Sequence, residues 1–301
     1  MGSTISLTLE APNADELITQ VFQFLIEFER RFSANNSQSD LMSISHQAGI
    51  APVAVDAQLF ELITLGVTHS LAEDSYLNIA IGPLVQAWRI GFSDARLPDA
   101  HTISAALALT DPTNIVLDAQ HQTVYLTEPG MKIDLGALAK GYAADLVADY
   151  LRQQGVQSAL INLGGNIVTI GYNYATQRLW QLGIQDPTQP RGQHIALLAS
   201  YNNSVVTSGI YERRLICENK SYHHIFNRTT GYPIETDVAS LTIVSDKSVD
   251  GEIWTTRLFG HPIAYILATV EQLPQIEALI IDTHNQLYST SGLTHQLVKL
   301  N

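Results

Sequence analysis

Five segments of this chain combine glycine with acidic, basic or hydroxyl side chains in patterns that packing alone does not explain. The segments are IDLGALAKGYAAD (133–145), LINLGGN (160–166), VTSGIYERR (206–214), YHHIFNRTTGYPI (222–234) and DGEIWTTRLFG (250–260). Taken singly, each also fits an ordinary role, such as a helix cap, a tight turn or a solvated helix face. We therefore judge their chemistry together.

The last of these segments offers oxygen ligands for a metal ion. Glu252 and Thr256 are four residues apart, so one turn of a helix brings both side chains onto the same face. Magnesium prefers such hard oxygen ligands and completes its octahedron with water and phosphate oxygens. Asp250 is a further carboxylate, but helical spacing turns it away from Thr256, so it is the weaker candidate.

The first segment suits an anion. The strand-like MKIDL (131–135) runs through a turn at Gly136 into a long helix, and free N–H groups at a helix start favour phosphate. Lys140 lies on the first turn of that helix and can reach the same anion as a point charge. Asp134 stands just before the turn, where a plain helix cap and a ligand contact both remain open.

Several enzyme classes are excluded by missing motifs. The chain contains no GxxxxGK[ST], HExxH or GxSxG motif and no EF-hand loop, and no strand leads into GxGxxG. Cys217 is the only cysteine, which rules out an intramolecular disulfide and a cysteine-based zinc site. His223 and His224 are adjacent and lack the spacing of zinc ligands.

Composition indicates a folded, acidic protein. Of 301 residues, 46% are hydrophobic and 15% charged, and 29 acidic against 16 basic residues give a net charge of −13. Such a surface repels phosphate backbones and anionic lipids, so we expect no nucleic-acid partner. The start of the chain resembles no signal peptide, and no apolar run reaches the ~18 residues of a membrane span. We expect a soluble protein without a transmembrane segment, cytoplasmic, or extracytoplasmic if a leader has been removed.

The predicted elements change in type near residue 110. A strand at 5–10 is followed by helices at 14–32, 40–46, 57–72, 83–88 and 101–109. A hairpin at 114–126 and the strand-to-helix segment 131–155 come next, followed by strand-like runs at 159–163, 166–171, 179–184, 194–199, 204–208, 212–219, 240–245 and 277–282, with helices at 248–260 and 263–272. This order predicts an α+β fold with a helix-rich N-terminal third and a strand-rich remainder.

Nine blocks of the chain, in order, resemble the FAD:protein FMN transferases, the ApbE-type flavin transferases. Besides the five segments above, these are MGSTISL, FERRFSANNSQSDLMSISHQAG, IGPLVQAW and WQLGIQDP. The resemblance covers essentially the whole chain and implies one T-fold-like domain over residues 1–301. It also implies transfer of FMN from FAD to a threonine hydroxyl of a flavin-accepting protein, with Mg²⁺ required and AMP released.

The resemblance assigns roles to individual residues of this sequence. It implies that the backbone carbonyl of Ala137 joins Glu252 and Thr256 as a metal ligand. It places His224 near the phosphates or the acceptor, as a base or as a donor to the leaving group, with Lys140 on the phosphates.

Further positions match FAD-contacting positions of the family. Asp134 would accept hydrogen bonds from the flavin, and Ser208 and Gly209 lie in a turn where backbone can approach the nucleotide closely. Asn35 and Asn78 complete this set.

Three of the matching positions depart from the family's pattern. Glu252 stands where the family usually has Asp, which moves the carboxylate by about 1.5 Å within a strict octahedral site. Asn78 replaces a usual Asp and carries no charge. Asn35 stands near a frequent aromatic residue and cannot stack on the nucleotide.

Two rival functions remain open from the sequence. An FAD pyrophosphatase would use water in place of the threonine, and a non-catalytic FAD-binding protein would leave FAD intact. Incubation with FAD and magnesium separates the three, because the products are labelled acceptor plus AMP, FMN plus AMP, or unchanged FAD.

Overall fold

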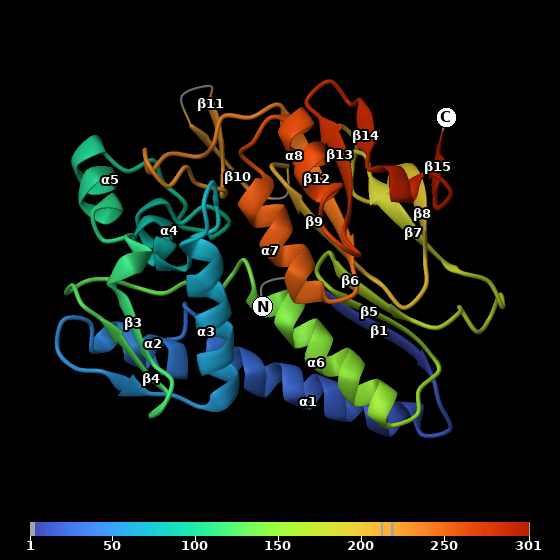
Figure 1. The fold of residues 1–301 in the computed structure, drawn as a ribbon, viewed down its shortest axis with the longest axis horizontal. Coiled ribbons are helices and arrows are strands. Elements are labelled where there is room, and N and C mark those ends of the chain that lie inside the picture. The colour runs from blue at the N-terminus through green and yellow to red at the C-terminus, as the bar shows by residue number, and fades with distance from the viewer. Residues whose placement is uncertain (1–3, 212, 218–219, 301) are drawn as a thin grey trace.

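The computed structural model describes residues 4–211, 213–217 and 220–300 (Figure 1). The first three residues of the MGSTISL block lie outside this range. The helices are α1 (Ala14–Phe32), α2 (Asp40–His46), α3 (Ala57–Ser70), α4 (Gly82–Trp88), α5 (Ala100–Leu107), α6 (Ala139–Gln153), α7 (Ser248–Leu258) and α8 (Ile263–Val270), with 3₁₀ turns η1 (Ile79–Ile81), η2 (Pro112–Asn114) and η3 (Ser291–Leu293).

The strands follow mainly in the second part of the chain. They are β1 (Ile5–Glu10), β2 (Val53–Ala54), β3 (Ile115–Asp118), β4 (Thr123–Leu126), β5 (Ser158–Leu163), β6 (Asn166–Ile170), β7 (Trp180–Gln185), β8 (His194–Ser200), β9 (Ser204–Gly209), β10 (Arg214–Cys217), β11 (Lys220–His223), β12 (Val238–Ser245), β13 (Glu277–Asp282), β14 (Leu287–Ser289) and β15 (Leu297–Lys299). This distribution agrees with the predicted α+β organisation.

One large antiparallel sheet organises the structure. Its strand order is β1-β5-β6-β9-β12-β13-β14, and each neighbouring pair is antiparallel. Apolar side chains of one face pack on α6, α7 and α8, and those of the other face pack on the small sheet β15-β8-β7 (Figure 1). Because both faces are covered, every residue of β12 is buried.

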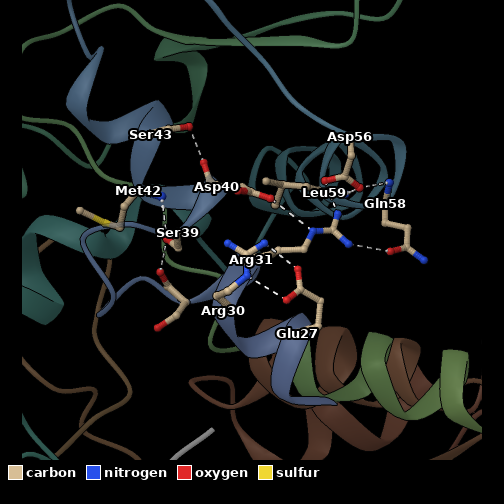
Figure 2. Close-up of polar contacts among 11 residues, drawn as sticks. Glu27, Arg30, Arg31, Ser39, Asp40, Met42, Ser43, Asp56, Gln58 and Leu59 are labelled. Atoms are coloured by element: carbon tan, nitrogen blue, oxygen red, sulfur yellow. Dashed lines mark hydrogen bonds and ion pairs between the residues drawn. The ribbon is translucent and has the colours of Figure 1, made fainter. Parts of the chain in front are cut away.

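The helix-rich third lies beside this layer and is joined to it by α1. Phe28 and Phe32 of α1 stack at 4.0 Å between ring centroids within a core that α2, α3 and α6 share. Figure 2 shows the polar side of the same junction, where Arg31 forms ion pairs with Asp56 and, at 3.3 Å, with Asp40. The end of α1 is therefore fixed to the starts of α2 and α3.

Helix caps predicted from the sequence are confirmed at two of three positions. Ser39 Oγ accepts a hydrogen bond from the N–H of Met42 at 3.0 Å (Figure 2), and Asp56 likewise caps α3. Asn13 makes no side-chain cap, so that prediction is wrong.

The segment 131–135 is not the strand that its alternating pattern predicts. Met131, Ile133 and Leu135 are buried as a strand would bury them, but the segment belongs to none of the sheets. Its backbone bonds instead to η1, where the N–H of Asp134 donates to the carbonyl of Ile79 at 2.8 Å. No helix in the described ranges has both the length and the apolar composition that crossing a bilayer requires.

Candidate active site

Three polar side chains from three elements form a closed hydrogen-bonded cluster, in which Glu252 and Asn166 are buried and Lys140 is partly exposed. Lys140 Nζ of α6 lies 2.6 Å from Glu252 Oε1 of α7 and donates to Asn166 Oδ1 at 2.8 Å. The amide of Asn166, at the start of β6, donates to the same Glu252 oxygen at 2.9 Å. Glu252 is only 4% exposed and Asn166 1%, so the carboxylate is held by a cation and an amide rather than by water.

Glycines make this meeting possible. Figure 1 shows α6 and α7 side by side on the sheet, and a Cβ on Gly141 would lie 2.5 Å from the carbonyl oxygen of Ser248 and 2.8 Å from Glu252 Cγ. The turn before β6 uses Gly164 and Gly165, both at positive φ, to bring Asn166 to the cluster. The predicted LGGN turn is therefore confirmed, and it also positions a site residue.

Asp134 lies at the start of the turn that leads into α6. Its Oδ1 accepts a hydrogen bond from the N–H of Gly136 at 2.7 Å. Burial raises the pKa of Asp134, while this hydrogen bond and the positive charge of Arg213 act in the opposite direction. Asp134 therefore closes a turn ahead of α6 and does not cap the helix, whose N-cap position is Leu138 without a side-chain cap. The predicted helix cap is wrong, and the contact with a ligand stays a prediction.

His224 follows β11 and is neutral. Burial, together with the positive charge of Arg213, lowers the pKa of His224 to about 3. Its Nδ1 is buried and has no hydrogen-bond partner among the described residues. The neighbouring His223 is engaged structurally, because its Nε2 lies 2.8 Å from the carbonyl oxygen of Ile234. The unpartnered nitrogen can accept a hydrogen bond from a substrate group, whereas a pKa this low makes the ring a weak proton acceptor until a nearby negative charge raises that pKa.

The two asparagines are placed differently from one another. Asn78 is 8% exposed and uses both ends of its amide, accepting from Ala80 N at 2.9 Å and donating to Thr110 O at 2.7 Å. It thereby holds the η1 segment against which Asp134 is bonded. Asn35 lies in an open loop, where its side-chain oxygen accepts from Arg89 Nη1 at 3.3 Å.

The remaining predicted positions lie on the same group of elements. Ala137 is in the turn before α6, and Thr256 is half-buried, one turn after Glu252 on α7. Ser208 and Gly209 do not lie in the predicted turn but in the last two positions of β9, where they pair with Leu241 and Ser240 of β12. The same strand pairs with β6 at Asn166. A Cβ at Gly209 would lie 2.6 Å from a ring carbon of Tyr211, so no side chain fits at this position.

The donor set suits a hard cation. The described residues hold no group of three or more His, Cys, Asp or Glu side chains placed to share a metal ion. An ion here would have one carboxylate, Glu252, with the hydroxyl of Thr256, the carbonyl of Ala137 and substrate oxygens, which is a magnesium-type set. Asp250 is half-buried on the first turn of α7, where its negative charge raises the pKa of Asp145.

Sequence reasoning missed two residues of the site. The sequence pattern places Asn166 only in a turn. A polar residue at the start of a buried strand nevertheless indicates a side chain that needs a polar partner. Arg213 is one of two adjacent arginines, and the sequence pattern does not single it out as a site residue. Its side chain packs over Gly91, where a Cβ would lie 2.8 Å from Arg213 Cδ, and its charge acts on both Asp134 and His224.

Known proteins resemble this chain over nearly its whole length. The chain is 42% identical over 291 residues to an FAD:protein FMN transferase of Klebsiella pneumoniae (strain 342), covering 97% of this chain and 90% of that protein. It is 36% identical over 293 residues to an FAD:protein FMN transferase of Treponema pallidum (strain Nichols), covering 93% and 81%. Flavin transferase ApbE from Vibrio cholerae superposes with a TM-score of 0.85 at 26% identity, covering 97% and 95% of the two chains.

A second solved structure supports the fold. The ApbE protein of Thermotoga maritima superposes with a TM-score of 0.86 at 24% identity, covering 97% of this chain and 94% of that one. The predicted ApbE-type α+β architecture is thus confirmed. A model of the ApbE family matches residues 1–280, so this chain belongs to the ApbE family.

Proposed function

We propose that this chain transfers FMN from FAD to a threonine hydroxyl of an acceptor flavoprotein, releases AMP and requires Mg²⁺. The observation that carries the proposal is the hydrogen-bonded Lys140–Glu252–Asn166 cluster beside the start of α6, with neutral His224 nearby. Two ApbE relatives named FAD:protein FMN transferase, at 42% and 36% identity, support the same activity.

The reaction is a displacement at the phosphorus of the FMN half. The threonine oxygen forms a bond to that phosphorus, the bond to the AMP phosphate oxygen breaks, and the hydroxyl proton must leave. His224 is the base in this proposal: its unpartnered Nδ1 takes that proton once the negative charge of bound FAD has raised the low pKa of the ring. Lys140 and the free N–H groups at the start of α6 would offset the charge of the pyrophosphate.

The other site residues bind the substrate and the cation. Glu252, Thr256 and the Ala137 carbonyl would hold Mg²⁺, which when bound would neutralise phosphate charge.

Asp134 would accept hydrogen bonds from the flavin. Ser208 and Gly209 would lie along the nucleotide. Asn35 would contact FAD from its loop, and Asn78 would act through the η1 segment that it holds.

Hydrolysis of FAD is the second candidate. An unpartnered nitrogen on His224 can accept a proton from water as readily as from threonine, so the same site would release free FMN and AMP.

The test is incubation with FAD, MgCl₂ and a flavin-accepting domain, beside the same domain with its threonine changed to alanine. Transfer predicts AMP and covalent flavin on the intact domain alone. Equal AMP with free FMN in both reactions would replace transfer by hydrolysis, and unchanged FAD would remove both.

A further inference from the structure

The helix that carries Glu252 and Thr256 has no cap of its own. Lys247, at the N-cap position of α7, makes no side-chain cap, and the hydroxyl of Ser248 is buried without a partner among the described residues. The first N–H groups of a helix nevertheless need acceptors. A side chain from another helix supplies them.

That side chain is Asp145 of α6. The N–H of Ser248 donates to Asp145 Oδ1 at 2.6 Å, and the N–H of Val249 donates to Asp145 Oδ2 at 2.9 Å. Each carboxylate oxygen thus accepts one main-chain amide of the first turn of α7. An interhelical cap of this kind fixes the position of α7 along its axis and its rotation, as well as satisfying its N–H groups.

The cap lies in line with the active-site contacts. Gly141 and Asp145 are four residues apart on one face of α6, and both touch the start of α7, Gly141 at the carbonyl of Ser248. Glu252 lies one turn further along α7 and contacts Lys140, the neighbour of Gly141. Successive turns of the two helices are therefore in register.

We propose that Asp145 is a positioning residue, whose carboxylate clamps the first turn of α7 and thereby sets the place of Glu252 and Thr256 in the site. The catalytic consequence of this clamp rests on the proposed function, whereas the clamp itself rests on the contacts between α6 and α7. Asp145 touches neither the reacting atoms nor the metal-ligand candidates.

The negative charges around Asp145 disfavour its ionised form, so the ionised clamp is not explained by a gain in folding stability. Asp149 on α6 and Asp250 on α7 both bring negative charge towards it. Asp149 is paired with Arg152 at 3.1 Å, and Lys247 and Asp246 act on Asp250. Burial raises the pKa of Asp145 to about 6, against the two amide hydrogen bonds that favour its ionised form.

Stability and clamping consequently respond to pH in opposite directions. The folded pKa of Asp145, about 6, lies above the unfolded value of 3.8, so the unfolded chain loses this proton first. The contribution of Asp145 to stability is greatest below pH 4 and declines as the pH rises to 6. The clamp forms in that same window, because a protonated carboxyl presents a hydroxyl that cannot serve both amides.

The decisive variant is Asp145→Asn, which is isosteric but has only one acceptor oxygen. We expect amide hydrogen exchange of Ser248 and Val249 to accelerate at least tenfold at pH 8. We expect kcat for AMP release to fall at least tenfold, with less than a threefold change in the KM for FAD. The unfolding midpoint at pH 8 should change little, because the loss of one amide hydrogen bond opposes the gain from removing a buried charge.

A second variant tests the other side of the clamp. Ser248→Pro deletes one donated N–H at the first position of α7, where proline is tolerated after the extended Lys247. Removing a donor to the carboxylate should move the acid limb of the rate profile to higher pH, whereas Asp145→Asn should abolish that limb. Asp99→Asn is the matched control, because Asp99 caps the distant α5 through the N–H of Thr102 at 2.8 Å.

The outcomes separate the possibilities. Wild-type exchange at Ser248 and Val249 in Asp145→Asn would overturn the clamp. A lower unfolding midpoint at pH 8, with kcat and KM falling together, would make Asp145 merely structural. If the wild-type chain releases no AMP from FAD, the proposed function fails, while the exchange experiment still decides the clamp.

Discussion

Lys140 and Glu252 are 112 positions apart in the chain, yet Lys140 Nζ lies 2.6 Å from Glu252 Oε1. The Glu252 side chain is 5% exposed and that of Lys140 is 23% exposed, so the carboxylate is buried while the lysine is partly open to solvent. This arrangement leaves the lysine accessible to an anionic substrate while its charge offsets a carboxylate that water does not reach. The pair therefore links the helix start that we propose binds phosphate to the candidate metal ligand.

Changing Glu252 to Gln should abolish turnover, with a loss of at least a hundredfold in kcat/KM. A neutral amide is a poor magnesium ligand and no longer balances Lys140. Glu252→Asp, which has the family's usual residue, should retain activity. Asp250→Asn is the matched control and should alter AMP release by less than threefold, because its position on α7 is turned away from Thr256. The reverse ranking in a steady-state assay would reassign the carboxylate ligand.

Lys140→Ala should weaken FAD binding and also destabilise the fold. Removing one partner of a buried ion pair leaves the Glu252 charge uncompensated, which typically costs about 3–5 kcal/mol. Urea unfolding measures this loss, and fluorescence titration with FAD measures the affinity. Lys220→Ala removes an exposed pair with Glu235, so its stability should change by no more than about 1 kcal/mol. Equal, small losses in both variants would mean that the buried pair contributes little.

His224→Asn should flatten the acid side of the stability profile. The folded pKa of His224, about 3, lies below its unfolded value of 6.5, so only the unfolded chain binds this proton between those values. The wild-type contribution is present above pH 6.5 and is lost as the pH falls, by about 1.4 kcal/mol per pH unit. Chemical denaturation at pH 4.5, 5.5 and 7 compares the two slopes. Parallel slopes would contradict a neutral, buried His224.

Turnover should require Mg²⁺ or Mn²⁺ and should not be supported by Ca²⁺. The candidate ligands Glu252, Thr256 and the Ala137 carbonyl are all oxygen donors and are only three, so water and substrate oxygens would have to complete the coordination, which suits Mg²⁺ better than Ca²⁺ with its six to eight ligands. Release of AMP from FAD, followed after chelation and re-addition of each cation, tests this. Full turnover in excess chelator would show that these residues serve another purpose.

Local patterns in the sequence determined much of the architecture. The apolar spacing of α1, the Ser39 and Asp56 caps, the hairpin of β3 and β4 and the α6 terminus at Gly155 all depend on near neighbours, and the structure agrees with each. The i, i+4 spacing of Glu252 and Thr256 is likewise set by the helix they share.

Contacts between distant segments were decided only by the tertiary structure. The alternation of residues 131–135 predicted a strand, but whether an extended segment joins a sheet depends on the partner beside it, and here that partner is η1. Asn166 and Arg213 gained their roles from side chains far away in the chain. The same holds for Asp145, whose carboxylate meets the amides of Ser248 and Val249 only because the sheet packs α6 against α7, and no local pattern encodes that packing.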